Sequence, residues 1–112
     1  MSVDKKLNLF GSKQRTDVLI LLRLLEQSYP SELADLLEAP VFSVQKIVEA
    51  LESDGIIISH KVGRTRLLTF NSRFIASKEL DALLWKLGKG NTRLQKIAAR
   101  KRRRPRRKGK PG

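Results

Sequence analysis

The side chains of this chain that could do chemistry are almost all cationic or hydrogen-bonding, and they fall into three groups. The first surrounds Gln45 and Lys46, the second is a basic turn at residues 60–65, and the third is a run of arginine and lysine from Arg100. Glutamine and lysine can contact the edges of bases, whereas arginine and lysine hold phosphates. These residue types predict a nucleic acid as partner.

Residues that carry catalysis or bind metals are scarce. The chain has no cysteine, and His60 is its only histidine, so neither a thiolate site nor a pair of imidazole ligands can form. No glycine-rich phosphate loop and no nucleophile paired with a base can be recognised. We therefore expect no enzyme activity, no catalytic residue, no cofactor and no metal.

The charge is divided unevenly along the chain. The formal net charge is +13, yet residues 1–85 hold 11 basic and 11 acidic side chains, and residues 86–112 hold 13 basic and no acidic ones. The long-range attraction for a polyanion therefore comes from the C-terminal part.

Residues 30–58 must position the first group. They predict a short helix, a turn, a second helix that Gly55 ends, and an apolar strand. In the second helix, apolar side chains recur at i, i+3, i+4 and i+7 from Val44, and Glu49 lies on the opposite, outward side with Gln45 and Lys46. This pattern is typical of a helix-turn-helix, although any small helical bundle shows the same periodicity.

Further elements flank this stretch. Residues 56–58 and 66–70 predict a β-hairpin. Residues 16–27 predict a first helix with more apolar side chains than one face needs, which indicates either a central position in its own monomer or a dimer seam. A last helix, with Ser77 as a candidate cap, carries a leucine stripe from residue 80 to residue 87, and Trp85 lies on its other face.

Three segments together resemble a known family. LADLLEAPVFSVQKIVEALESDGIIISHKVGRTRLLTFN resembles winged helix-turn-helix transcriptional regulators of the arsenic-repressor-like (ArsR) type, also close to the MarR type. LFGSKQRTDVLILLRLL and NSRFIASKELDALLWKL resemble the first and closing helices of a subgroup, so the likeness covers roughly residues 7–87. The cysteines or clustered histidines with which relatives sense metals are missing here.

The resemblance implies a mainly α fold with a small β-hairpin wing (α+β), in the order α-α-α-β-β-α. It also implies a homodimer formed through the first and last helices, with Trp85 as a candidate anchor. The turn between the two helices of the helix-turn-helix departs from the family. Glu38 stands in this turn at the position where the family usually has a glycine with a positive φ. Pro40 is expected either as the first residue of that helix or ahead of a later start capped by Ser43, and Ser31 is expected to cap the preceding helix.

Gly88 and Gly90 are expected to end the order, so that residues 1–90 form the winged helix-turn-helix domain and residues 91–112 a disordered basic tail. Within the tail, residues 104–111 resemble a degenerate AT-hook in which lysines replace the arginines; a generic polybasic arm on phosphates is the alternative.

Together these features predict a sequence-specific, double-stranded-DNA-binding transcriptional regulator, cytoplasmic and nucleoid-associated, with no membrane partner. The alternative is an adaptor or architectural protein whose domain docks a protein partner while the tail binds DNA or RNA without reading sequence. Glu49 and Glu52 could accept from cytosine or pair with Lys46 and solvent. The residues expected to bind DNA are Val41, Phe42, Ser43, Gln45, Lys46, Glu49, Lys61, Arg64, Thr65, Arg66, Arg100, Lys101, Arg102, Arg103, Arg104, Arg106, Arg107, Lys108 and Lys110.

Overall fold

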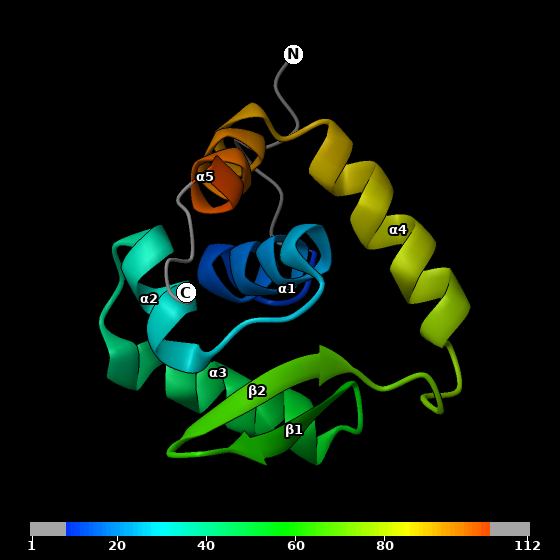
Figure 1. Cartoon of the computed structure of the whole chain (residues 1–112). Coiled ribbons are helices and arrows are strands. Elements are labelled where there is room, and N and C mark those ends of the chain that lie inside the picture. Colours follow the sequence, from blue (N-terminus) through cyan, green and yellow to red (C-terminus); the bar gives the residue numbers. More distant parts are fainter. Residues whose placement is uncertain (1–8, 104–112) are drawn as a thin grey trace.

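The computed structural model describes residues 9–103, which form five helices and one two-stranded antiparallel hairpin, an α+β arrangement (Figure 1). In chain order the elements are α1 (Lys13–Leu25), α2 (Pro30–Leu37), α3 (Val41–Ser53), β1 (Ile57–Val62), β2 (Thr65–Phe70), α4 (Ser77–Lys89) and α5 (Thr92–Arg103).

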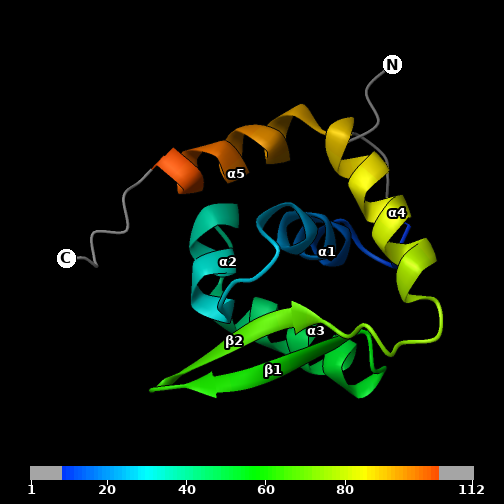
Figure 2. The same ribbon diagram turned by 45° about the vertical axis from the view of Figure 1, so that its right-hand side comes forward.

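Helix α1 is the centre of the core. Figures 1 and 2 show α2, α4 and α5 arranged around it, with α3 and the hairpin on the side away from α5. Val18, Leu19, Leu21 and Leu22 are each 0% exposed. The apolar surplus of this helix is therefore used within one chain, and it gives no reason to expect a dimer seam along α1.

The hairpin closes in a tighter turn than the sequence indicated. β1 and β2 pair in register up to Val62 and Thr65, so the loop consists of Gly63 and Arg64, with Gly63 at φ +62°. A two-residue loop with a positive φ at its first position suits glycine. His60, expected in the turn, instead belongs to β1.

One further rung extends the sheet beside β2. Ser28, in the link between α1 and α2, forms two backbone hydrogen bonds with Leu68. The N–H of Ser28 donates to the carbonyl of Leu68 at 3.3 Å, and the N–H of Leu68 donates to the carbonyl of Ser28 at 2.7 Å. Ser28 and Leu68 are buried, so the rung fastens the start of α2 to the hairpin.

The end of α3 at Gly55 is confirmed. Gly55 has φ +78°, its N–H donates to the carbonyl of Glu52 at 3.0 Å, and the N–H of Ile56 donates to the carbonyl of Leu51 at 2.9 Å. These two bonds are the Schellman arrangement that satisfies the last carbonyls of a helix.

The predicted helix starts were less accurate. Helix α2 begins at Pro30, so Ser31 is inside the helix and is not its cap. Proline at the first helical position costs nothing because its missing N–H would be unpaired there. Pro40 occupies the cap position of α3, one residue before the helix, and Ser43 lies inside α3. Glu38 has φ +55°, the positive value expected of that turn.

Gly88 and Gly90 do not end the ordered part of the chain. Gly88 is buried within α4, and a Cβ there would lie 3.0 Å from Leu24 Cδ2 and 3.3 Å from Ile20 Cγ2. Its missing side chain therefore lets α4 approach α1 closely. Ser77 is the first residue of α4, not its cap, and its hydroxyl donates to the carbonyl of Ser72 at 3.1 Å.

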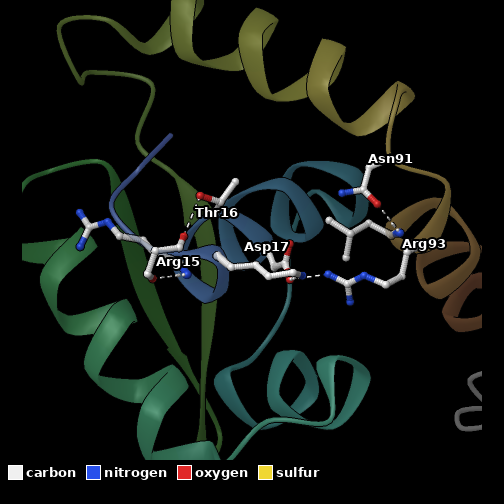
Figure 3. A network of polar contacts seen from close by, with 8 residues as sticks. Arg15, Thr16, Asp17, Asn91 and Arg93 are labelled. Carbon is white, nitrogen blue, oxygen red and sulfur yellow. Dashed lines mark hydrogen bonds and ion pairs between the residues drawn. The ribbon is translucent and has the colours of Figure 1, made fainter. Parts of the chain in front are cut away.

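Helix α5 starts at a well-formed cap. The side-chain oxygen of Asn91 accepts a hydrogen bond from the N–H of Leu94 at 2.9 Å, and Asn91 is only 3% exposed (Figure 3). Leu94 and Ala98 are 0% and 1% exposed, and Ile97 packs partly buried beside them. These positions form an apolar stripe that faces the core.

Two ion-pair contacts hold α5 against other helices. Arg93 pairs with Asp17 of α1, which also accepts from Lys13 at 3.1 Å (Figure 3). Near the other end of α5, Lys101 lies 2.8 Å from Glu32 of α2. Acidic residues far away in sequence thus offset part of the positive charge of α5.

The expectation of a disordered tail is therefore wrong for residues 92–103, and the fold continues past residue 90. Local composition indicates disorder here because basic residues outnumber apolar ones, but the apolar face and the ion-pair partners lie on α1 and α2. Residues 104–112, which include the AT-hook-like segment, lie outside the described residues. Among residues 9–103, no helix is long and apolar enough to cross a membrane.

Candidate nucleic-acid interface

The outward side of α3 is open to solvent. Phe42 is 66% exposed and Val41 42%, and Gln45, Lys46 and Glu49 are also exposed. The inward side of the helix, from Val44 to Leu51, packs into the core as the periodicity predicted. The ammonium of Lys46 lies 5.4 Å from the centre of the Phe42 ring, a cation–π distance that places both side chains together on the outer surface.

The hairpin tip presents cations next to α3. Lys61 and Arg64 are exposed, and neither forms an ion pair within residues 9–103. Thr65 has a local role, since its hydroxyl donates to the carbonyl of Val62 at 2.9 Å and braces the turn.

Arg66 is engaged within the fold. Its guanidinium lies 2.5 Å from Glu52 Oε1 and donates to Ser59 Oγ at 3.2 Å, and Ser59 Oγ donates to the other Glu52 oxygen at 2.7 Å. Glu52 thus pairs with Arg66 and not with Lys46, the partner considered from sequence. The triad links α3 to both strands, so it fixes the angle between α3 and the hairpin.

A surface cleft joins the hairpin tip to the two helices. It is lined by side chains from the start of α2, from α3 and from the hairpin: Tyr29, Pro30, Ser31, Gln45, Arg64, Thr65 and Arg66. The positive end of the α2 dipole and the Arg64 guanidinium both favour an anion at this place. Neither Tyr29 nor Ser31 was predicted from the sequence as a binding residue, although Pro30 at a helix start was a usable signal that backbone donors would gather there.

Charges on the outer side of α3 and at the hairpin tip leave a small cationic surplus. Lys46, Lys61 and Arg64 add positive charge, Glu49 is negative, and Asp54 is paired with Arg15 at 3.4 Å. Three cations and one carboxylate leave a cationic surplus of two charges among these side chains.

The predicted DNA-binding residues separate into two groups. Those on α3 and the hairpin lie together, with Ser43 half-buried among them. Arg100 is exposed on α5, and α5 lies across α1 from α3 in both views (Figures 1 and 2). Lys101 is paired with Glu32, as described above. Of the remaining basic residues, Arg102 and Arg103 lie in α5, and Arg104, Arg106, Arg107, Lys108 and Lys110 lie outside the described residues.

No known protein family, curated protein or solved structure matches this chain. Within residues 9–103, no three His, Cys, Asp or Glu side chains gather as a metal site would require. The geometry of α3, the hairpin and α5 therefore has to indicate the function.

Trp85, the expected dimer anchor, is partly engaged by its own chain. The guanidinium of Arg23 lies 4.9 Å from the ring centre, and Arg23 Nε lies 2.6 Å from Asp81 Oδ1, one turn before Trp85 on α4. Trp85 remains 43% exposed and Leu83 38%. One face of the ring therefore joins α4 to α1, and the remaining exposed apolar surface of α4 is modest.

Proposed function

We propose that this protein is a sequence-specific DNA-binding transcriptional regulator of the winged helix-turn-helix type. In this proposal α2 and α3 form the helix-turn-helix, and β1 with β2 forms the wing. The element order from α1 to β2 and the rung between Ser28 and Leu68 support this assignment. The observation that carries it is the exposed outward side of α3 beside the hairpin tip. At this tip Lys61 and Arg64 form no ion pair with any residue that the structure describes.

The chemistry of α3 suits the major groove, which is about 12 Å wide and admits one helix. Gln45 can bond adenine N6 and N7, and Lys46 can donate to guanine O6 and N7; each good base contact contributes about 1–3 kcal/mol of discrimination. Phe42 and Val41 can contact thymine methyl groups. Lys61 and Arg64 would hold backbone phosphates and set the register of α3 along the duplex.

The Arg66–Glu52–Ser59 triad has a positioning role in this proposal. Because it ties the hairpin to α3, the phosphate-holding tip and the base-contacting helix keep one relative orientation. Base discrimination depends on such fixed geometry, since a helix that rocked in the groove would contact several registers equally well.

A second candidate function is docking of a protein partner. Val41 and Phe42 are 42% and 66% exposed on the outward side of α3, where the cationic surplus is small. Such a surface also suits the apolar centre of a protein interface.

Selection of bound fragments from random duplex DNA tests both candidates. The full-length protein should recover a consensus, and Gln45→Ala with Lys46→Ala should lose preference at particular positions while melting at the same temperature. Lys78→Ala, an exposed lysine on α4, is the matched control and should leave the consensus unchanged. Absence of a consensus for the unaltered protein would favour protein docking, and an unchanged consensus for the α3 variant would exclude α3 as the reader.

A further inference from the structure

Helix α5 carries basic side chains on its outer side and no acidic residue. Arg93, Lys96 and Arg100 recur at i, i+3 and i+7, and all three are exposed. We call these three residues the α5 stripe. The opposite side of the helix is the apolar stripe that packs on the core, so Lys96 and Arg100 lie on the outer side of the fold. Arg93 lies at the edge of the α5 stripe, where it also pairs with Asp17 of α1.

The α5 stripe lies on the other side of the molecule from α3. Figures 1 and 2 both show α1 between α5 on one side and α3 with the hairpin on the other. DNA has a persistence length of about 50 nm, so a duplex seated on α3 stays nearly straight over the size of this domain. The α5 stripe therefore cannot reach the phosphates of the duplex that α3 holds.

The stripe is also held in a defined position. Asn91 caps the start of α5, Arg93 is anchored to Asp17, and Lys101 is anchored to Glu32 at the far end. From the first to the last residue the stripe spans about 10 Å at about 1.5 Å per helical residue. One DNA strand presents a phosphate every 3.4 Å or so along the axis, so this length matches about three phosphates.

We propose that the α5 stripe is a second DNA-binding site, which contacts the backbone of another duplex, so that one molecule bridges two DNA segments. The proposal rests on the proposed function, because α3 and the hairpin hold the first duplex. Arginine and lysine without accompanying base-reading groups suit phosphate contacts that any sequence can supply. The second segment is therefore bound without regard to its sequence, and the first segment determines where bridging occurs.

A two-duplex capture assay tests this. A duplex that carries the selected consensus is fixed to beads, the full-length protein is added at about 0.1 M salt, and capture of a labelled duplex of unrelated sequence is measured. The variant K96E/R100E should capture little of the labelled duplex while binding the consensus duplex as before. Because each phosphate contact contributes about 0.9 to the salt slope, the slope of capture should flatten by about 2 units. The matched control R73E/K78E reverses two exposed charges elsewhere and should capture as the unaltered protein does.

Several results would overturn the proposal. Undiminished capture by K96E/R100E would assign bridging to residues 104–112 or to paired copies of the α3 surface. Capture of single-stranded RNA in preference to the labelled duplex would assign the α5 stripe a different partner.

A second variant, K96Q/R100Q, removes the charges without adding acidic groups and should lose capture too. If neither variant melts early, the loss comes from the α5 stripe itself. Failure of the proposed function has a separate signature, namely no consensus from the unaltered protein.

Discussion

Truncation of one buried side chain tests whether α5 is part of the folded domain. Leu94 is 0% exposed, and it belongs to the same core as α1. Leucine-to-alanine changes at such sites cost about 2–5 kcal/mol, from lost burial and from the cavity that remains. A domain of this size is stable by roughly 5–15 kcal/mol in total. Leu94→Ala should therefore remove a large share of the stability.

The measurement is urea unfolding followed by circular dichroism, together with a thermal melt. Since 1 kcal/mol shifts the Tm of a domain of about 60–100 residues by about 4–8 °C, the variant should melt at least about 8 °C earlier. Lys96→Ala, on the exposed side of the same helix, is the control and should change the stability by less than about 0.5 kcal/mol. If both variants unfold at the same urea concentration and temperature as the unaltered protein, α5 does not pack on the core. The core would then not hold the α5 stripe in position as a second DNA-binding site.

Further predictions concern DNA binding and assembly. Arg64→Ala should weaken DNA binding with a stability change below about 0.5 kcal/mol, and a much earlier melt would reveal a structural role instead. Replacing thymine by deoxyuridine in the consensus should weaken binding by the unaltered protein but not by Phe42→Ala; equal affinities for both DNAs would exclude a methyl contact. Deleting residues 104–112 should flatten the salt slope by about 0.9 per lost phosphate contact and keep the consensus, whereas loss of an A·T preference in the flanks would indicate the AT-hook. We also expect a dimer through the outer side of α4, which Leu83→Glu should convert to monomer in sedimentation; a monomeric unaltered protein, with and without DNA, would exclude it.

The parts of the fold that local chemistry determines could be predicted from the sequence. The apolar repeat from Val44 identified the buried side of α3, and Gly55 identified its end, because the Schellman arrangement needs a residue that tolerates positive φ. The two strands followed from β-branched and apolar residues around Gly63, although the turn between them is shorter than expected. In these cases the determining contacts lie within a few residues.

The parts that depend on distant contacts could not be predicted in the same way. Arg66 is cationic and close to the hairpin tip, so its type indicated a phosphate contact, but Glu52 pairs with it. The basic composition of α5 indicates disorder, so this helix could not be predicted from its own residues. Leu94 and Ala98 stabilise it only because α1 supplies the apolar surface on which they pack. The long apolar run of α1 was the available signal, because a helix that is apolar on several sides needs covering on several sides.

The central place of α1 also has a consequence for synthesis of the chain. Asp17 and its partner Arg93 are 76 residues apart, so α1 is made long before the helix that covers it. At about 5–20 residues per second, the apolar faces of α1 wait roughly 4–15 s for α5 to be synthesised. During that interval the exposed apolar surface of α1 can associate with other nascent chains that are made on the same messenger RNA. A chaperone that covers α1 during this interval should therefore raise the yield of folded protein.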